Sequence, residues 1–456
     1  MRRRVHLVGI GGSGLSAIAR VLHERGDVVS GSDREPNERT ESLARDGVAI
    51  AVGQRAENVA GVDLLLVSSA IGDDNPEVAA ARLAGIPVLR RQAFLGALTT
   101  GLRTIAVAGT HGKTTTTALI AWILHQAGRQ PGYILGGISP DLGGNGAAGG
   151  GSTFVIEADE YDRAFLGLHP AIGVVTNVEY DHPDLFPAIL EYQYAFEAFV
   201  HLVEEKLIVC QEDPVAASLI HPTVPRETYG WSAEADWRAA DVRPNSAGGS
   251  DFLAFHGEAS LGLIQTRLPG RHNVLNALAA LAAVDSFEIP LAVTRQALTE
   301  FQGVERRFAV LGESAGVVVI DDYAHHPTEI RATLEAVRTR WPGREVWAVF
   351  QPHTFSRTRA LAADFARAFG QADHVVVTAI FASRERPEMG IDGAWLVAKI
   401  VHEDVRHAES LEEAAAMVID GMQPPAVVVT LSAGDANRVG QIVLDDLRGR
   451  GSSGKG

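Results

Sequence analysis

The chain has 456 residues, a formal net charge of −16 and 46% hydrophobic residues. This length predicts about three domains, and the hydrophobic content is sufficient for several cores. The acidic balance argues against a nucleic-acid-binding surface, which would be basic. The single cysteine, Cys210, excludes an intramolecular disulfide and is typical of a reducing compartment, so we expect a cytoplasmic protein. No segment reaches the roughly 18 apolar residues that a membrane helix needs, so we predict no membrane insertion.

The first predicted element is a strand at residues 5–8, followed by the run Gly-Ile-Gly-Gly-Ser-Gly at 9–14 and a helix. This is the G-x-G-x-x-G pattern in its strand–turn–helix context, which places a pyrophosphate at the helix N-terminus. Asp33 follows about 20 residues later, where an acid that binds ribose belongs. The motif therefore indicates a nucleotide site, and taken alone it leaves a nicotinamide dehydrogenase open.

A second strand of the same predicted domain, residues 64–67, ends in Ser68 and Ser69. These serines either face the ligand or cap the strand end, and the sequence is equally compatible with both roles. We expect a Rossmann-like domain over residues 1–98. Its predicted ligand-binding residues are Gly11, Gly12, Ser13, Gly14, Asp33, Ser68 and Ser69.

The central stretch of the chain is an apolar strand at residues 104–108, a glycine turn at 109–112 and a helix that begins at Lys113. This arrangement is typical of a phosphate-binding loop, because backbone N–H groups at a helix N-terminus and the helix dipole attract an anion. Lys113 would reach the outer phosphates of ATP, and the hydroxyl of Thr114 would bind Mg²⁺. Only Thr-His separates the glycines, so the loop is shorter than the general G-x-x-x-x-G-K-[ST] template. The alternatives are a P-loop ATPase switch and a plain turn with a solvated lysine.

The loop sequence Gly-Thr-His-Gly-Lys-Thr-Thr at residues 109–115 resembles the ATP loop of the Mur ligases, the ATP-dependent amide-forming enzymes of peptidoglycan precursor synthesis. The resemblance extends from about residue 4 to the last predicted helix. It implies an α/β protein of three domains. These are a Rossmann-like UDP-sugar-binding domain (1–98), a P-loop ATPase domain (99–302) and a doubly wound C-terminal α/β domain that binds the acceptor amino acid (303–448).

Two segments predict little regular structure. Residues 140–152 are glycine-rich and favour a mobile loop, not a folded element. Residues 449–456 are rich in Gly, Ser and Lys and predict a disordered tail.

Acidic residues follow two predicted strands of the middle domain. Glu157 ends the first, and the second is followed by Asp181 and His182. A single acid at a strand end is most often a helix cap, but two such clusters beside a phosphate loop indicate Mg²⁺ binding through oxygen. The resemblance selects Glu157 and His182 as metal ligands and Asp181 as the partner that orients the imidazole. Imidazole is an unusual ligand for Mg²⁺, so His182 rests on the resemblance.

The segment at residues 270–277 opens a helix with Asn273 and Asn276 one turn apart. Asparagine amides can pair with an adenine edge, whereas the structural alternative is N-capping by Asn273. The resemblance places Asn276 at the adenine, with His272 close by. It also places Arg307, in the hinge that leads into the last domain, near the nucleotide phosphates.

The last domain has predicted strands at 317–320, 346–350 and 427–431, each followed by a polar cluster. Ligands bind outside the carboxyl ends of such strands, so one face of this sheet is predicted to be functional. The resemblance puts Asp322 on the ATP ribose and His353 and Arg357 near the acceptor. Thr354 stands where many relatives have arginine. His353 and His182 are the candidates for deprotonating the acceptor amine.

The resemblance thus implies an ATP-dependent ligase that activates the carboxylate of UDP-N-acetylmuramate as an acyl phosphate and transfers it to L-alanine. ATP and Mg²⁺ are the implied cofactors, and the chain is expected to be a monomer or homodimer. The nearest alternative is a recycling ligase with a ready-made peptide as acceptor. The predicted ATP-binding residues are Gly109, Thr110, His111, Gly112, Lys113, Thr114, Thr115, His272, Asn276, Arg307 and Asp322. The predicted catalytic residues are Lys113, His182, His353 and Arg357, and the predicted metal ligands are Thr114, Glu157 and His182.

Overall fold

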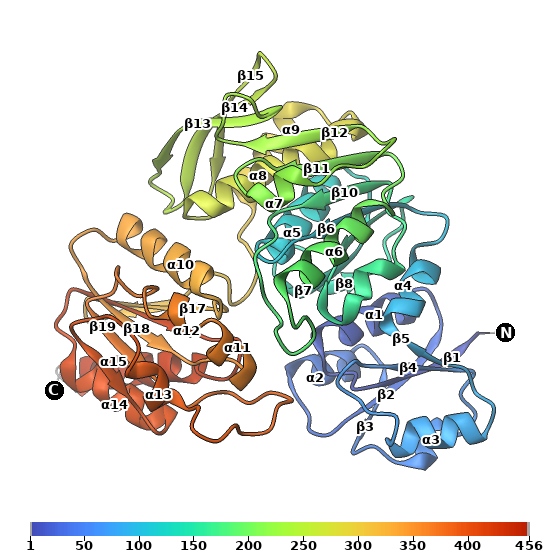
Figure 1. Ribbon diagram of the computed structural model, residues 1–456, viewed down its shortest axis with the longest axis horizontal. Coiled ribbons are helices and arrows are strands. Elements are labelled where there is room, and N and C mark those ends of the chain that lie inside the picture. The colour runs from blue at the N-terminus through green and yellow to red at the C-terminus, as the bar shows by residue number, and fades with distance from the viewer. Residues whose placement is uncertain (1, 454–456) are drawn as a thin grey trace.

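The computed structural model describes residues 2–453, which form three α/β units with one β-sheet each (Figure 1). The N-terminal unit is blue in Figure 1, the middle unit runs from cyan to yellow, and the C-terminal unit is orange to red. This confirms the predicted three-part α/β architecture. The exact boundaries at 98/99 and 302/303 stay predictions.

The N-terminal sheet has five parallel strands in the order β3-β2-β1-β4-β5. This is the strand order of a Rossmann-like sheet, so the predicted fold of this unit is confirmed. The central strand β1 and its neighbour β4 contribute apolar side chains to two separate clusters, which is typical of a parallel sheet that is covered on both faces. The strands are β1 (Arg4–Val8), β2 (Val28–Asp33), β3 (Ala49–Val52), β4 (Leu64–Val67) and β5 (Val88–Arg90). The helices are α1 (Ser13–Glu24), α2 (Glu38–Arg45), η1 (Ala56–Val59), α3 (Pro76–Leu83) and α4 (Arg91–Thr99).

The middle sheet has ten strands, and β6 lies in its interior between β10 and β9. Both neighbours run parallel to β6, so the phosphate loop after β6 lies beside the carboxyl ends of β9 and β10. The strands are β6 (Arg103–Ala108), β7 (Gly132–Ser139), β8 (Gly144–Ala147), β9 (Thr153–Glu157), β10 (Ile172–Val175), β11 (Lys206–Cys210), β12 (Arg226–Gly230), β13 (Trp237–Pro244), β14 (Ser250–His256) and β15 (Ala259–Thr266). The helices are α5 (Lys113–Gln126), η2 (Tyr161–Gly167), α6 (Ile189–Val200), α7 (Pro214–Ser218), α8 (Arg271–Val284), η3 (Asp285–Phe287) and α9 (Leu291–Glu300).

The glycine-rich segment 140–152 is partly folded, so the prediction of a mobile loop was wrong for its centre. Residues Gly144–Ala147 form β8, which pairs antiparallel with β7 and packs against α1. A Cβ on Gly146 would lie 2.8 Å from the Ala17 carbonyl oxygen, and Asn145 donates to the Ser16 hydroxyl at 2.9 Å. The glycines therefore permit close backbone approach between two domains.

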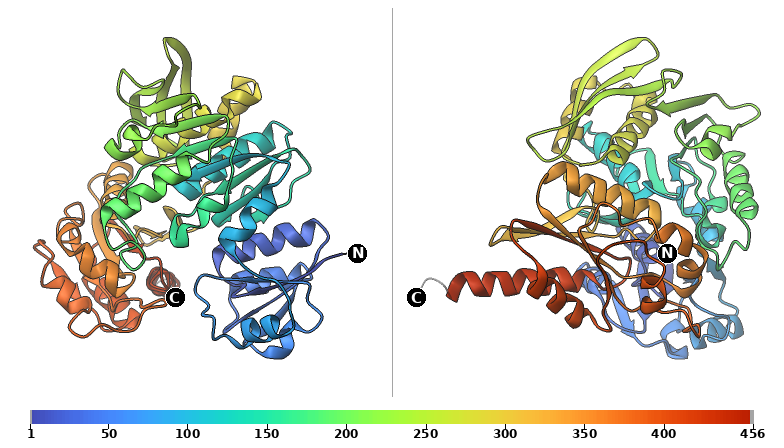
Figure 2. Two further views of the ribbon diagram at one scale, coloured as in Figure 1. Left: turned by 45° about the vertical axis from the view of Figure 1, so that its right-hand side comes forward. Right: turned by 60° about the vertical axis from the view of Figure 1, so that its left-hand side comes forward.

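The C-terminal sheet has the order β16-β17-β21-β18-β19-β20, parallel except for β16. The strands are β16 (Ala309–Ser314), β17 (Val317–Asp322), β18 (Glu345–Phe350), β19 (His374–Val377), β20 (Val405–His407) and β21 (Ala426–Leu431). The helices are α10 (Pro327–Arg340), α11 (Phe355–Ala360), α12 (Ala362–Phe365), α13 (Gly393–Val397), α14 (Leu411–Gly421) and α15 (Asn437–Ser453). Helix α15 projects from this unit (Figure 2) and continues to Ser453. The expected disorder of 449–456 therefore fails for 449–453, and 454–456 lie outside the described residues.

The hydrophobic cores show how the units are joined. One continuous cluster contains Leu7 and Phe94 of the N-terminal unit together with Phe165 and Phe199 of the middle unit. Both faces of the C-terminal sheet have their own clusters, and the half-buried Tyr180 of the middle unit packs against one of them. Among residues 2–453, no helix combines the length and apolar character needed to cross a lipid bilayer.

Candidate active site

The phosphate loop is shaped by two glycines with left-handed backbone. Gly109 has φ 136° and Gly112 has φ 80°, backbone conformations that residues with a side chain rarely adopt. A Cβ on Gly109 would collide with the Thr176 hydroxyl, and one on Gly112 would lie 2.5 Å from the Asn276 amide oxygen. Helix α5 starts immediately afterwards, so its free N–H groups face the loop. The sequence therefore builds an anion cradle that only glycine allows.

Lys113 is folded back over this loop. Its ammonium donates to the Gly109 carbonyl oxygen at 2.5 Å and to the Thr110 carbonyl oxygen at 3.1 Å, and it pairs with Glu160 at 2.8 Å. Burial alone would lower the lysine pKa, but the nearby carboxylates, Glu160 first, raise it. The side chains of Lys113 and Glu160 are only 12% and 1% exposed. The alternative of a solvated lysine is therefore wrong.

Glu160 is a site residue that the sequence did not single out. Its carboxylate also accepts from the Tyr192 hydroxyl at 3.3 Å and lies 3.4 Å from Nε2 of His182. The run of acids after β9 was visible in the sequence. Its spacing does not tell which acid faces the lysine, because the chain leaves the strand at Glu157 and turns.

The three predicted metal ligands, Thr114, Glu157 and His182, line one cavity of about 480 Å³ together with Lys113 and Glu160. The Glu157 carboxylate accepts from the Gly136 N–H at 2.6 Å, and burial raises its pKa. A hydroxyl and a carboxylate beside a phosphate cradle suit Mg²⁺, which prefers oxygen. His182 has φ 55°, a strained backbone for a non-glycine residue that the surrounding structure must hold. The hydroxyl of Thr114 and the carboxylate of Glu157 therefore fit Mg²⁺, and His182 as the third ligand stays a prediction.

Asp181 is occupied mainly by Arg357. Two guanidinium nitrogens reach its two oxygens at 2.6 and 3.1 Å, whereas the His182 ring nitrogen Nε2 is 3.8 Å away. Burial would raise the pKa of Asp181, but the charge of Arg357 holds it well below the usual range. Asp181 was expected to orient the His182 ring, but it makes no hydrogen bond to a nitrogen of that ring. Asp181 instead accepts the backbone N–H of His182 at 2.7 Å.

His353 completes this group. Its Nδ1 accepts from Nη1 of Arg357 at 2.9 Å, so the neutral ring carries its proton on Nε2. Burial and the charges of His325 and Arg357 lower its pKa to about 2. A ring with its basic nitrogen already engaged is a poor proton acceptor. His353 is thus better placed to donate a hydrogen bond to a substrate oxygen than to deprotonate an amine.

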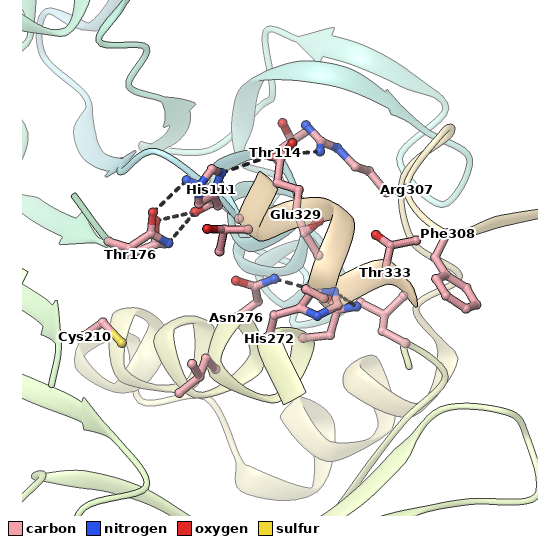
Figure 3. A pocket seen from close by; sticks show the side chains of 18 of the residues that line it. His111, Thr114, Thr176, Cys210, His272, Asn276, Arg307, Phe308, Glu329 and Thr333 are labelled. Atoms are coloured by element: carbon pink, nitrogen blue, oxygen red, sulfur yellow. Dashed lines mark hydrogen bonds and ion pairs between the residues drawn. The ribbon is translucent and has the colours of Figure 1, made fainter. Parts of the chain in front are cut away.

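A second cavity of about 300 Å³ lies between the middle and C-terminal units (Figure 3). Its lining unites the predicted residues His111, Gly112, Thr114, Thr115, His272, Asn276, Arg307 and Asp322. Burial lowers the pKa of His272 to about 4, so its ring is neutral near pH 7. Burial raises the pKa of Asp322 to about 6, while its two oxygens accept the N–H groups of Phe308 and Ala324. The structure therefore brings the predicted adenine and ribose residues together.

The N-cap of α8 is Gly270, so the alternative that Asn273 caps this helix was wrong. Asn273 instead accepts at 3.0 Å from the amide of Asn276, and the Asn276 amide oxygen accepts from Thr116 at 3.2 Å. These bonds fix the orientation of the Asn276 amide at the cavity wall.

The predicted UDP-sugar loop borders the same region. Ser13 and Gly14 line a cavity of about 550 Å³ that also reaches Thr114 and Glu157. Gly12, Ser68 and Ser69 line the neighbouring cavity. The Asp33 carboxylate accepts the Gly11 N–H at 2.8 Å, so these two residues shape the loop in this structure.

Arg39 and Arg91 line both of these cavities and were missed from the sequence. Arg91 pairs with Asp159 at 2.5 Å. An arginine near a glycine loop or a domain boundary does not by itself indicate a binding site. Arg39 and Arg91 line these cavities only because two domains fold against one another.

Three family models match the sequence in order. They are described as "Mur ligase family, catalytic domain" (residues 4–103), "Mur ligase middle domain" (107–284) and "Mur ligase, glutamate ligase domain" (306–434). Each match falls on one of the three sheets. The three family models therefore divide the chain in the same way as the three sheets.

Similar proteins cover nearly the whole chain. The UDP-N-acetylmuramate–L-alanine ligase of Roseiflexus sp. (strain RS-1) is 43% identical over 97% of this chain and 99% of the relative. That of Syntrophobacter fumaroxidans is 42% identical over 99% of this chain and 98% of the relative.

Among solved structures, the UDP-N-acetylmuramate-alanine ligase of Thermotoga maritima is 30% identical, with a TM-score of 0.83 and coverage of 98% and 99% of the two chains. A murein peptide ligase from Psychrobacter arcticus is 25% identical with a TM-score of 0.73, over 97% and 98%. The chain belongs to the Mur ligase family.

Proposed function

We propose that the chain is an ATP-dependent ligase that joins L-alanine to the carboxylate of UDP-N-acetylmuramate during peptidoglycan precursor synthesis. The observation that carries this function is the near-complete match at 43% identity to a ligase of that name. The geometry supports it, because the phosphate cradle, the predicted metal ligands and the N-terminal glycine loop border two cavities that share lining residues. We expect the activity in the cytoplasm. A monomer or homodimer remains a prediction.

In the first step, the carboxylate of the UDP-sugar attacks the γ-phosphorus of ATP, ADP leaves, and an acyl phosphate forms. Lys113 and the N–H groups at the start of α5 stabilise the charge on the transferring phosphoryl group. Thr114, Glu157 and His182 are the residues that would hold Mg²⁺. The bound cation would neutralise phosphate charge at this position.

In the second step, the amine of L-alanine attacks the acyl carbon, the amide bond forms and inorganic phosphate leaves. His353 offers an N–H to a substrate oxygen, and Arg357 holds that ring in place. The C-terminal unit supplies both residues, so its approach to the middle unit completes the site and excludes water from the acyl phosphate.

The adenosine part of ATP fits the cavity lined by His272, Asn276 and Asp322. The UDP-sugar fits the cavities at Ser13 and Gly14, where Arg39 and Arg91 supply positive charge for its phosphates. This assignment leaves no role for a nicotinamide. It also gives the chain a substrate domain that a P-loop switch does not need.

The recycling ligase with a peptide acceptor is the nearest competing function. The alanine ligase structure resembles this chain more closely than the murein peptide ligase structure, with TM-scores of 0.83 and 0.73. The difference favours a free amino acid as acceptor.

An acceptor screen tests the proposal. Purified protein, ATP, Mg²⁺ and UDP-N-acetylmuramate are incubated with L-alanine, with glycine and L-serine as small competitors, or with an L-alanyl tripeptide. We expect the highest kcat/KM for L-alanine, and mass spectrometry should identify the UDP-sugar amide. A preference for the tripeptide would overturn the assigned acceptor. ATP cleavage without any amide product would overturn the ligase function.

A further inference from the structure

The guanidinium of Arg357 is fully engaged by the protein itself. Its Nε and Nη2 donate to the two Asp181 oxygens at 2.6 and 3.1 Å. Its Nη1 donates to Nδ1 and to the carbonyl oxygen of His353, at 2.9 and 3.3 Å, and Nη2 also donates to Nδ1 of His182 at 3.4 Å. A guanidinium has five N–H groups, and these contacts use all five. The carboxylate of an acceptor amino acid therefore needs another cation.

Arg384 lines the same cavity of about 480 Å³ and neither of the other two cavities described above. Its side chain is 36% exposed. Its guanidinium carbon lies 3.8 Å from the centre of the Tyr161 ring, and its ion-pair partner Asp184 is 3.7 Å away, beyond hydrogen-bond distance. Stacking on a ring occupies the face of a guanidinium and leaves its N–H edge free. The edge of Arg384 is therefore available to a ligand in the cavity.

Two anchors hold the backbone of Arg384 beside His353. Phe381 stacks on the His353 ring with 5.8 Å between the ring centres, and the same two residues form an isolated parallel β-bridge. The Glu385 carboxylate accepts two backbone N–H groups at the start of α11, at 2.7 and 3.0 Å. Arg384 lies between these anchors in the chain, so it cannot move far from the histidine that faces the same cavity.

The other cations of this cavity are close to different parts of the substrates. Lys113 belongs to the phosphate loop, and Arg307 also lines the nucleotide cavity. Arg39 and Arg91 come from the N-terminal unit and line the cavity at its glycine loop. Arg384 comes from the C-terminal unit, which supplies the acceptor end of the site in the proposed mechanism.

We propose that Arg384 binds the carboxylate of the acceptor amino acid and thereby selects a free amino acid over a peptide. The inference rests on the ligase function proposed above. In a free amino acid, the carboxylate is attached to the carbon that carries the reacting amine, so one guanidinium beside His353 can hold it through two parallel N–H···O bonds. In a peptide, a neutral amide takes that position. Arg357 then acts indirectly, by holding His353 and Asp181 in place.

Steady-state ligation with two acceptors tests this assignment. L-alaninamide keeps the reacting amine of L-alanine but has a neutral amide instead of the carboxylate. Arg384→Met should raise the KM for L-alanine by at least about 10-fold, because two charge-assisted hydrogen bonds are lost. The kcat at saturating L-alanine should fall much less, and the KM for L-alaninamide should stay close to the wild-type value. Arg384→Lys keeps the charge without the two parallel donors, so it should recover part of the preference for L-alanine.

Arg386→Met is the matched control. Arg386 lies two residues away in the same loop, is exposed and does not line the cavity. Arg384→Met and Arg386→Met change the net charge equally, so a long-range effect of charge would appear in both variants. We expect wild-type KM values in Arg386→Met, and thermal unfolding should show that all three variants fold.

Three outcomes would overturn the assignment. They are an unchanged KM for L-alanine in Arg384→Met, an equal rise for both acceptors, and an equal effect of Arg386→Met. An equal rise for both acceptors would show that Arg384 only supports the surrounding structure. Failure of the ligase function itself is recognised separately, because wild-type protein would then form no amide with L-alanine, and the acceptor assignment would fall with it. Normal ligation by the wild type with an unaffected Arg384→Met variant would overturn the assignment alone.

Discussion

The N-terminal and C-terminal units contact the middle unit through different chemistry. On the N-terminal side, Phe94 and Phe165 belong to one continuous apolar cluster, β8 packs directly on α1, and the ion pair Arg91–Asp159 is added to this apolar contact. On the C-terminal side, the described contacts include the ion pairs Arg357–Asp181 and His111–Glu329. Apolar contact is broad and non-directional, whereas ion pairs form in one geometry and are lost together when two surfaces separate.

The hinge is consistent with this difference. Arg306 and Phe308, which flank Arg307, have φ 60° and 55°, unusual values for residues other than glycine. The C-terminal unit is therefore the one that we expect to open and close during turnover, while the N-terminal and middle units move together.

The largest effect is expected at Lys113, in the cradle itself. Lys113→Met should lower kcat/KM by about 10³-fold, because the charge that stabilises the phosphoryl group is lost. It should also cost about 3–5 kcal/mol of unfolding free energy, since the carboxylate of Glu160 stays buried without its partner. Steady-state kinetics and urea unfolding measure the two effects.

The double variant Lys113→Met/Glu160→Gln separates the two roles of Lys113. The double variant should regain much of the lost stability, because residue 160 no longer carries a buried charge. It should regain none of the activity, because the phosphate loop still lacks the lysine ammonium. Recovery of ligation in the double variant would remove Lys113 from the chemistry.

Arg357 and Asp181 test the polar junction. Arg357→Ala and Asp181→Asn should each lower kcat/KM for L-alanine by about 10²-fold, through misplacement of the C-terminal residues. Their effects should be strongly non-additive in the double variant, because both remove the same ion pair. If Asp181→Asn behaved as wild type while Arg357→Ala alone raised the KM for L-alanine, Arg357 would bind the acceptor carboxylate, as the resemblance implies.

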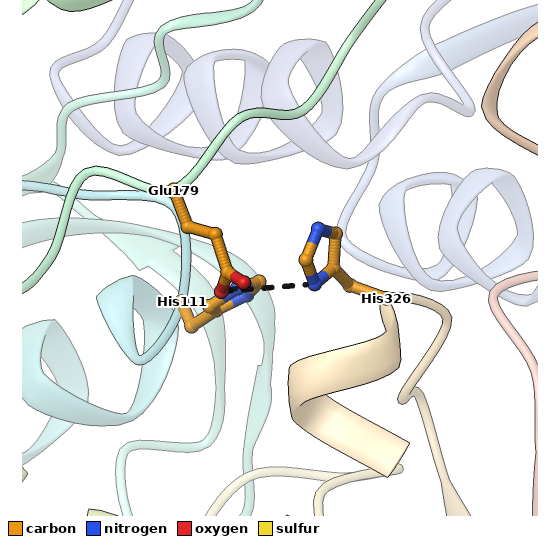
Figure 4. Close-up of side chains that lie close together, drawn as sticks. All are labelled: His111, Glu179 and His326. Atoms are coloured by element: carbon orange, nitrogen blue, oxygen red, sulfur yellow. Dashed lines mark hydrogen bonds and ion pairs between the residues drawn. The ribbon is translucent and has the colours of Figure 1, made fainter. Parts of the chain in front are cut away.

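The ion pairs of His111 with Glu179 (Figure 4) and Glu329 should weaken as the pH rises. Burial would lower the pKa of His111, but Glu179 and Glu329 raise it to about 9. A raised pKa stabilises the folded state fully below the ordinary value of about 6.5, and this contribution declines to zero as pH rises through about 9.

The contribution at low pH is about 3 kcal/mol. Unfolding free energies of wild type and His111→Gln, measured in EDTA from pH 6 to 10, should therefore converge. His326, His272 and Arg307 also lie near this pair. A difference that stays constant with pH would exclude a charged His111.

The apolar junction is tested by Gly167→Ala. An added Cβ would collide with the Gln92 carbonyl oxygen of α4, a backbone atom that cannot move aside. We expect a loss of about 1–3 kcal/mol in unfolding free energy with little change in the KM for L-alanine. Gly370→Ala is the control, because nothing lies within 4 Å of its Cβ position. Equal stability of the two variants would contradict close backbone packing at this junction.

Much of the fold was predictable because strands and glycine turns are encoded locally. The strand, Gly109–Gly112 and Lys113 are adjacent in sequence, so their phosphate loop followed from spacing. The glycine-rich segment that forms β8 was mistaken for a loop. Its glycines are required by the approach of α1, which is a contact between distant parts of the chain.

In the active site, too, contacts between distant parts of the chain could not be predicted. Glycine motifs and strand-end acids identified part of the cavity lining, whereas His272, Asn276 and Arg307 were predicted from the family resemblance. The pairing of Lys113 with Glu160, and of Asp181 with Arg357, could not be predicted, because each depends on how the chain turns after a strand or on how two domains meet. Residues that act across domain boundaries leave little local signal.

The central claim is that a carboxylate attacks ATP and that an amine then displaces phosphate. UDP-N-acetylmuramate labelled with ¹⁸O in its carboxylate, incubated with the protein, ATP, Mg²⁺ and L-alanine in ordinary water, tests it directly. Mass spectrometry of the released phosphate should find a single labelled oxygen in each, and release should depend on the UDP-sugar. Unlabelled phosphate, released at the same rate without the sugar, would show that water attacks ATP and would contradict the ligase mechanism.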